Sequence, residues 1–305
     1  MTEPARGRVA DRPALLVYNA SARNRHRAGP EALVAALRDA RWAVQHVPTR
    51  TPGDLNEVLR RYAGVVFVAG GDGTFREVAR RVAGRSDVDI ALIPMGTSNN
   101  VAGALNVTGS PLVVAQRYAS SRLRSIDAGR VRAPWGEDVF FEACGYGLFA
   151  DVLAAYDPEA PKSVLRGVRA VTHGLRRGRT YRPPVRIDGI PVPAGNVTLL
   201  EVMNTPTVSN GMRLAPNADV SDGFLDVVRI REDGQARPAR YVAAVLHNDF
   251  SALSGSQSPR VRSVQLPYDG QVFHIDGEVR AAQPGGRGCV HVDVWPQAVR
   301  IRVPV

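Results

Sequence analysis

The chain has 305 residues, of which 44% are hydrophobic, so it can bury one large core or two smaller ones. Its formal net charge of +10 comes almost entirely from arginine, since Lys162 is the only lysine, and it indicates either an anion-binding surface or a general preference for arginine. The cysteines, Cys144 and Cys289, match no metal-binding spacing, and no apolar run approaches the roughly 20 residues of a membrane span. We therefore expect a reduced, cytoplasmic protein whose contact with lipid, if any, is peripheral and at the inner face of the membrane.

From residue 14 to about residue 125, short apolar runs alternate with helical patterns. The helix after the second run is expected to begin with Thr51 as its N-cap and Pro52 at its first helical position. This alternation is typical of a parallel, doubly wound α/β sheet, which binds ligands beyond the carboxyl ends of its strands. The expected strands are Ala14–Tyr18, Trp42–Val47, Val65–Ala69 and Ile90–Pro94.

Beyond residue 125 the pattern changes to strand-like segments separated by glycine, proline, aspartate and asparagine. This change predicts an antiparallel, β-sandwich-like domain with one helical insert at Pro161–Gly178. We place an α/β domain at residues 1–125 and a β-rich domain at residues 126–305, and the last strand can return to the first domain. The expected strands are Asp138–Cys144, Val185–Ile187, Val197–Met203, Phe224–Ile230, Val261–Leu266, Val290–Val294 and Val299–Val303.

The strand ending at Ala69 runs into the sequence Gly-Gly-Asp-Gly-Thr at residues 70–74, and a helix is expected from Phe75 to Val82. Glycine allows positive φ and leaves backbone amides accessible, and a helix N-terminus adds partial positive charge, so the segment predicts a phosphate-binding turn. Asp72 would repel phosphate directly, but it can hold a Mg²⁺ ion that neutralises both charges. An ordinary strand-to-helix turn is the alternative.

A second strand ends in the same way, in the sequence Pro-Met-Gly-Thr-Ser-Asn-Asn at residues 94–100. Thr97 can donate a hydroxyl hydrogen bond to phosphate, and Asn99 and Asn100 can hydrogen-bond a nucleotide or substrate. Asn99 can equally be the cap of the next helix.

Two further turns carry carboxylates. Asp276 and Glu278 flank a glycine, so one can accept a hydroxyl proton while the other orients it, although an Asp-Gly hairpin turn is the simpler interpretation. In the turn at residues 218–224, Asp222 and nearby carbonyl groups suit a hard cation, with a plain turn as the equal alternative.

The motifs together occur in the order seen in the diacylglycerol kinase catalytic-domain family, which includes soluble bacterial lipid kinases and is similar to sphingosine kinases. The resemblance runs from about residue 14 to residue 303. GGDGT alone also occurs in NAD kinases and 6-phosphofructokinases, whereas the ordered set is specific. The matching segments are GGDGT, PMGTSNN, SIDAG at 125–129, LAPNA at 214–218, SDGFLD at 221–226 and DGE at 276–278.

The resemblance implies a lipid kinase that binds ATP and Mg²⁺ in a cleft between its two domains. Asp276 and Glu278 match the pair from which the family draws its catalytic base, and Asp72 joins them as a catalytic residue. Asp72 and Asp127 would share a network of water and magnesium, and Asp222 with the carbonyl groups of Asp219 and Phe224 matches a structural Mg²⁺ site. The residues assigned to the nucleotide site are Asn19, Thr49, Gly70, Gly71, Asp72, Gly73, Thr74, Phe75, Arg76, Thr97, Asn99 and Asn100.

The chain departs from the family pattern at three places. Asn19 is followed by alanine and serine where the family usually has proline, and Phe75-Arg76 replaces the commoner Ile-Asn. Asn100 stands where the family usually carries aspartate, which removes a carboxylate and indicates a different metal arrangement or weaker activity.

In the expected reaction Asp276 or Glu278 takes the proton of a lipid hydroxyl as the γ-phosphoryl group transfers in line. The insert at Pro161–Arg179 has the pattern of a basic amphipathic helix, which either meets a membrane surface or packs on its own domain. The expected partner is a lipid rather than nucleic acid, because no nucleic-acid motif is present. The sequence leaves two questions open: whether the chain forms a homodimer, and which lipid it phosphorylates. The alternatives are an NAD kinase-like enzyme and a nucleotide-binding regulator without strong catalysis.

Overall fold

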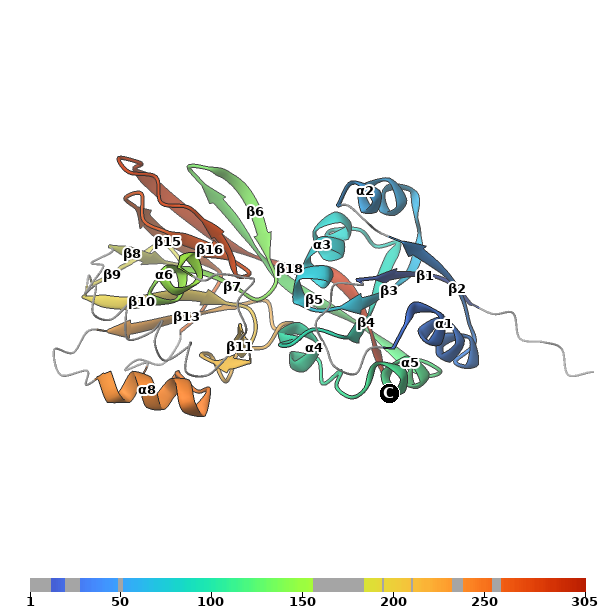
Figure 1. The fold of residues 1–305 in the computed structure, drawn as a ribbon. Coiled ribbons are helices and arrows are strands. Elements are labelled where there is room, and N and C mark those ends of the chain that lie inside the picture. The colour runs from blue at the N-terminus through green and yellow to red at the C-terminus, as the bar shows by residue number, and fades with distance from the viewer. Residues whose placement is uncertain are drawn as a thin grey trace, which may run out of the picture. The chain divides into compact units, whose positions relative to one another are not determined.

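The computed structural model describes residues 12–19, 28–48, 52–155, 184–193, 195–209, 211–231, 238–253 and 259–305 (Figure 1). They form two compact units. The first contains residues up to Thr97, residues 106–124 and residues 300–305, and the second contains residues 98–105 and 125–299. The segment 98–105, which the sequence places in the first domain, therefore belongs to the second unit. The chain changes unit at both ends of the segment 98–105 and again inside two strands, β5 (Ser121–Ala133) and β18 (Gly288–Pro304).

The first unit is built on a parallel sheet, as the alternation of strands and helices predicts. Its strand order is β2-β1-β3-β4, and the C-terminal end of β18 adds a further parallel strand beside β4. The strands are β1 (Arg12–Tyr18), β2 (Trp42–Pro48), β3 (Gly64–Gly70) and β4 (Val88–Pro94).

Helices cover both faces of this sheet: α1 and α5 lie on one side and α2 and α3 on the other (Figure 1). Helix α2 begins at Pro52, as the sequence predicts, whereas Thr51 lies outside the described residues. The helices are α1 (Pro30–Asp39), α2 (Pro52–Arg61), α3 (Asp72–Val82) and α5 (Pro111–Arg117).

Three aromatic rings form part of the core of the first unit. Phe67 lies edge-on to Trp42 and to Tyr118, with 5.2 Å between ring centroids in each pair. The polar atoms of the other two rings also find partners, because Trp42 Nε1 donates to the carbonyl of Tyr118 at 3.0 Å and the Tyr118 hydroxyl donates to the carbonyl of Leu92 at 2.9 Å. The chain segment after α5 is thereby fixed to the sheet.

The second unit is largely antiparallel. One sheet has the order β14-β13-β10-β7-β16-β17; the other contains β15, β8 and β9 next to β18, with β5 and β6 attached, and β11 and β12 form a small hairpin. The strands are β6 (Gly136–Phe140), β7 (Ala143–Gly147), β8 (Val185–Ile187), β9 (Ile190–Val192), β10 (Val197–Met203), β11 (Thr207–Val208), β12 (Met212–Arg213), β13 (Leu225–Arg231), β14 (Arg260–Val261), β15 (Ser263–Tyr268), β16 (Phe273–Ile275) and β17 (Glu278–Arg280).

Four of the expected strands need correction. The expected strand Asp138–Cys144 is two strands, because the chain bends at Phe141 and Glu142, and the expected strand Val261–Leu266 is divided between β14 and β15. The last two expected strands are one continuous strand, β18. The predicted insert at Pro161–Gly178 lies outside the described residues.

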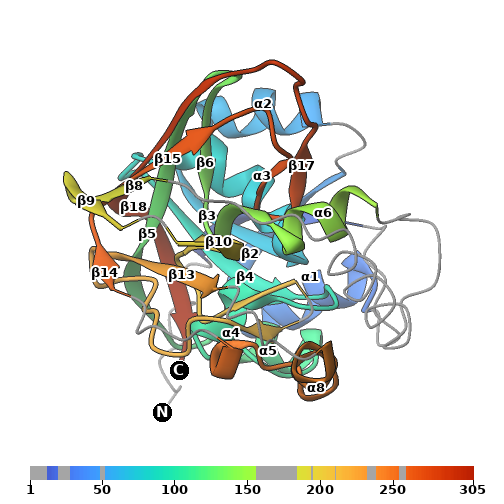
Figure 2. The same ribbon diagram turned by 90° about the vertical axis from the view of Figure 1, so that its left-hand side faces the viewer.

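Side chains alternate between two cores along the strands of the six-stranded sheet. Leu200 and Val202 of β10 belong to a cluster shared with β15 and β18. Leu199 and Met203 belong to a cluster shared with two helices, whose ribbons are labelled together with β10 in Figure 2. These helices are α6 (Leu148–Ala154) and α8 (Pro238–His247); the short helices α4 (Asn100–Ala104) and η1 (Ser251–Leu253) complete the unit. None of the helices in the described ranges has the length and apolar character needed to span a bilayer.

We predict that Gly145→Ala strongly destabilises the protein. A Cβ atom at this position of β7 would lie 2.2 Å from the carbonyl oxygen of Leu200, which the sheet cannot move aside. We expect a loss of about 2–4 kcal/mol in the free energy of unfolding, measured by urea denaturation. Gly103→Ala is the matched control, because nothing lies within 4 Å of its Cβ position in α4, and this variant should unfold at an unchanged or higher urea concentration. Equal midpoints for the two variants would contradict the prediction.

Candidate active site

The two glycine-containing turns lie at neighbouring strand ends. Gly70, the last residue of β3, is the register partner of Pro94, the last residue of β4, and Met95 donates its amide to the carbonyl of Gly70 at 2.8 Å. The exposed Thr97 follows on the second turn. Both glycine-containing turns thus lie at the same edge of the sheet, within the first unit.

The first turn leads directly into α3. Gly71 is the N-cap residue, and the first intrahelical hydrogen bond runs from the amide of Phe75 to the carbonyl of Gly71 at 3.0 Å. The amides that precede Phe75 at the start of the helix have no acceptor within it, and together with the helix dipole they favour an anion. Asp72 lies in this first turn, so a metal cation between it and a phosphate group would suit the local charges.

The glycines of this turn are required for a different reason from the one expected. Gly70, Gly71 and Gly73 all avoid the positive-φ region. Instead, a Cβ atom on Gly70 would lie 2.4 Å from Thr74 Oγ1, so Gly70 is needed for close approach of the Thr74 side chain. Thr74 Oγ1 also accepts a hydrogen bond from Asn19 Nδ2 at 2.9 Å, which ties the end of β1 to the turn.

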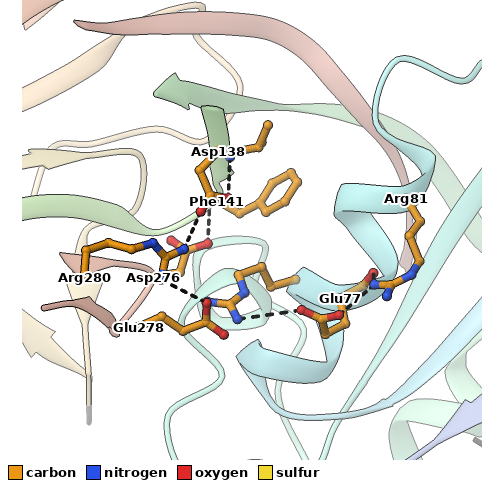
Figure 3. A network of polar contacts seen from close by, with 9 residues as sticks. Glu77, Arg81, Asp138, Phe141, Asp276, Glu278 and Arg280 are labelled. Atoms are coloured by element: carbon orange, nitrogen blue, oxygen red, sulfur yellow. Dashed lines mark hydrogen bonds and ion pairs between the residues drawn. The ribbon is translucent and has the colours of Figure 1, made fainter. Parts of the chain in front are cut away.

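Two predicted nucleotide residues, Phe75 and Arg76, are buried, with 3% and 6% of their surface exposed. Phe75 therefore packs in the core of the first unit, and Arg76 approaches Glu77 at 3.7 Å. Glu77 in turn accepts a hydrogen bond from Arg81 one helical turn later at 2.7 Å (Figure 3). Thr49, a further predicted nucleotide residue, lies outside the described residues.

Asp276 and Gly277 form the turn between β16 and β17. Their φ angles are 47° and 77°, the left-handed values that a two-residue type I′ hairpin requires and that an Asp-Gly pair favours. The hairpin interpretation of this motif is therefore confirmed. It does not exclude a catalytic role, since the same turn fixes the positions of both carboxylates.

The Asp276 carboxylate accepts three backbone hydrogen bonds from the bend between β6 and β7. Phe141 donates at 2.9 Å (Figure 3), and Glu142 and Ala143 donate at 2.8 Å and 3.1 Å. The Asp276 amide returns a hydrogen bond to the carbonyl of Ala143 at 2.8 Å. These contacts use both carboxylate oxygens and join the hairpin to the bend.

Glu278 is in a more open environment. Its side chain is 47% exposed, and its carboxylate lies 3.5 Å from Arg280 Nη1. Arg280 makes a second ion pair with Asp138 of β6 (Figure 3). Of the two predicted carboxylates, Glu278 is therefore the more accessible to a ligand.

Asn100 is almost fully buried, at 3% exposure, and its amide group contacts protein on both sides. Its Nδ2 donates to Glu142 Oε2 at 2.7 Å and to the carbonyl of Ser209 at 3.0 Å, and its Oδ1 accepts from the Thr207 hydroxyl at 2.8 Å. Asn99 occupies the N-cap position of α4 in a left-handed conformation, and its side chain makes no capping hydrogen bond. No motif in the sequence pointed to Glu142, which lies 42 residues from Asn100 along the chain.

Asp127 stabilises the turn at residues 218–224. Its carboxylate accepts the amides of Gly223 at 2.7 Å and Gln297 at 2.8 Å, and its own amide donates to the carbonyl of Val220. Burial raises the pKa of Asp127, and the two amides oppose this change. Asp127 therefore connects β5, the turn and β18 within the second unit.

The predicted cation site in this turn has oxygen donors of the right type but competing contacts. Asp222 accepts the Phe224 amide at 3.0 Å on one oxygen and Arg260 Nη1 at 2.7 Å on the other. Asp219 accepts the amide and hydroxyl of Ser221. Within the described ranges no group of three or more histidine, cysteine or acidic side chains is placed to hold a metal. The metal role of this turn stays a prediction, and no step of a reaction is assigned to it.

A buried pair that the sequence did not indicate lies next to the hairpin. His274 of β16 and Glu201 of β10 are both paired with Gly145 of β7, and their side chains meet at 2.7 Å above this glycine. Their side chains are 1% and 0% exposed. Burial raises the pKa of Glu201, and His274 opposes this change.

Two family models match the chain, one in each half. Residues 13–131 match the family model described as the diacylglycerol kinase catalytic domain, and residues 154–303 match that of the YegS C-terminal NAD kinase beta sandwich-like domain. A diacylglycerol kinase from Mycobacterium tuberculosis is 25% identical over 242 residues, covering 78% of this chain and 76% of that protein. A probable lipid kinase YegS from Escherichia fergusonii is 25% identical over 307 residues, covering 97% and 98%.

The fold agrees as well. The crystal structure of a diacylglycerol kinase from Bacillus anthracis has a TM-score of 0.64 at 15% identity, over 95% of this chain and 96% of that one. The two matched domains and their names define a lipid kinase, a phosphotransferase. Residues 13–131 belong to the diacylglycerol kinase catalytic-domain family, and residues 154–303 to the family of the YegS C-terminal domain.

We predict that Glu201→Gln changes how stability depends on pH. Because burial raises its pKa, Glu201 in the folded protein keeps a proton at pH values where the unfolded chain has already released it. Stability is therefore lost as the pH rises from the unfolded pKa through the folded one. Between about pH 4 and pH 8, the urea midpoint of the variant should therefore fall less than that of the wild-type protein. Glu137→Gln, at an exposed position, is the control and should behave as the wild type does. An equal fall of the midpoint in the wild type and both variants would refute the assignment of this pH dependence to Glu201.

Proposed function

We propose that this chain transfers the γ-phosphoryl group of ATP, supplied as its Mg²⁺ complex, to the hydroxyl of a lipid such as diacylglycerol. The family supports the reaction class, and the relative from M. tuberculosis carries the name of this activity. The lipid would be reached at a membrane surface, in keeping with the partner expected from the sequence.

The observation that carries the proposal is the pairing of Gly70 with Pro94 at the ends of β3 and β4. It gathers both glycine-containing turns at the N-terminus of α3, where backbone amides and the helix dipole favour a polyphosphate. Asn19 and Thr74 stabilise the same turn by their hydrogen bond. The nucleotide is therefore assigned to this edge of the first unit.

Asp72 is the candidate for holding the metal that accompanies ATP. It lies in the first turn of α3, and a carboxylate is the ligand type that Mg²⁺ prefers. The ion would reduce the negative charge on the phosphate oxygens during transfer. The role of Asp72 is to keep this substrate complex in one orientation.

Glu278 is assigned as the general base. Asp276 is fully engaged in holding the bend, whereas Glu278 is about half exposed on the same hairpin. In the reaction the lipid oxygen forms a bond to the γ-phosphorus, the bond from phosphorus to the leaving oxygen of ADP breaks, and the hydroxyl proton moves to Glu278. Asp276 positions Glu278 through the hairpin.

The first experiment is transfer of labelled γ-phosphate from ATP to diacylglycerol, sphingosine and phosphatidylglycerol in mixed micelles, with NAD as a further acceptor. We expect a labelled lipid with the wild-type protein and a loss of about 100-fold or more in Asp72→Asn. NAD is included because the matched C-terminal domain is described as NAD kinase-like. Label on NAD alone would replace the lipid kinase proposal, and ATP binding without any transfer would favour a nucleotide-binding regulator.

The two carboxylates of the hairpin should respond differently to substitution. Glu278→Gln should lower kcat by about 100- to 10,000-fold while the urea midpoint stays unchanged. Asp276→Asn should lower stability by about 1–3 kcal/mol as well as activity, because its amide group cannot accept all three backbone hydrogen bonds.

Asp188→Asn is the matched control for the second variant. Asp188 also begins an Asp-Gly hairpin, between β8 and β9, and accepts the amides of Arg262 and Ser263 at 2.9 and 2.8 Å. It should lose stability without losing kcat. Full activity in Glu278→Gln would rule out this residue as the base.

A further inference from the structure

Glu142 makes contacts in three directions from the bend between β6 and β7. Its amide donates to Asp276 Oδ1 at 2.8 Å, and its carbonyl accepts the amide of Asn204 at 2.8 Å. Its carboxylate accepts Asn100 Nδ2 at 2.7 Å. The residue is 8% exposed, so these contacts are made almost entirely inside the second unit.

The amide orientation of Asn100 follows from its neighbours. Nδ2 faces two acceptors, Glu142 Oε2 and the carbonyl of Ser209, and Oδ1 faces the Thr207 hydroxyl, which can donate. An aspartate at position 100 would instead place a carboxylate against a second carboxylate and a carbonyl oxygen. Such a buried contact between acceptors is strongly unfavourable. Asparagine at position 100 is therefore matched to glutamate at position 142.

We propose that Glu142 and Asn100 form a positioning pair that fixes the bend at residues 141–143 and, through the three amides on Asp276, the location of the base Glu278. This inference rests on the proposed function for its catalytic consequence. The pair connects the start of α4, within the GTSNN motif, to the DGE hairpin, so two motifs that are far apart in the sequence become one rigid group. It also gives the departure at position 100 a structural reason, since Asn100 is matched to Glu142.

The test is a series of Asp/Asn and Glu/Gln substitutions at positions 100 and 142, measured in the kinase assay. Asn100→Asp should lower kcat about tenfold or more with a smaller change in the KM for ATP, because the base is displaced while the phosphate-binding turn at residues 70–74 is untouched. Glu142→Gln should lose about threefold or less, since its amide oxygen can still accept from Asn100. The double variant Asn100→Asp with Glu142→Gln restores a donor opposite the carboxylate and should recover most of the kcat lost in Asn100→Asp.

A second measurement does not depend on turnover. Hydrogen–deuterium exchange should increase in peptides covering residues 140–145 and 273–280 of Asn100→Asp and return toward wild type in the double variant. Asp188→Asn is the control, because it disturbs a different Asp-Gly hairpin and should leave both peptides and kcat unchanged.

The outcomes separate the two proposals. Unchanged exchange at residues 273–280 in Asn100→Asp, or a double variant no better than Asn100→Asp, would overturn the positioning pair. A wild-type protein that labels no lipid, with the exchange pattern as expected, would overturn the proposed function and leave the positioning pair supported.

Discussion

Three backbone amides at the bend between β6 and β7 converge on one carboxylate, that of Asp276. A bend in a buried strand would otherwise leave these donors without acceptors, at a cost of about 1–3 kcal/mol for each unsatisfied group. The hairpin between β16 and β17 supplies the acceptor, so the bend and the hairpin are stable only together. The same hairpin carries Glu278, which is why the geometry of this side chain depends on residues far away in the sequence.

The features that could be predicted from the sequence are those set by local chemistry. The four strands of the first unit are short apolar runs bounded by polar residues, and the structure has all four in a parallel sheet. The Asp-Gly pair at 276–277 is a hairpin signal because its backbone preference is local. The glycine-containing turn before α3 and its position at the strand ends were predictable for the same reason.

The features that escaped prediction depend on contacts between distant residues. The amide of Phe141 and the carboxylate of Asp276 are separated by 135 positions, so the division of the expected strand at the bend has no local signal. The need for Gly70 comes from the side chain of Thr74, not from its own φ. In the sequence, Asn100 shows only that a carboxylate is missing. Its hydrogen bond to Glu142, which explains the asparagine, is seen only in the structure.

The long strand β18 has a consequence for how the protein is made. Its residues Arg300–Arg302 pair with β4 in the first unit, while its earlier part, from residue 288, pairs with β15 in the second. During synthesis on a ribosome, the sheet that begins with β1 therefore stays one strand short until residues 125–299 have been translated. Because β4 presents an unpaired edge during that interval, the N-terminal sheet is exposed to mispairing until its final strand arrives.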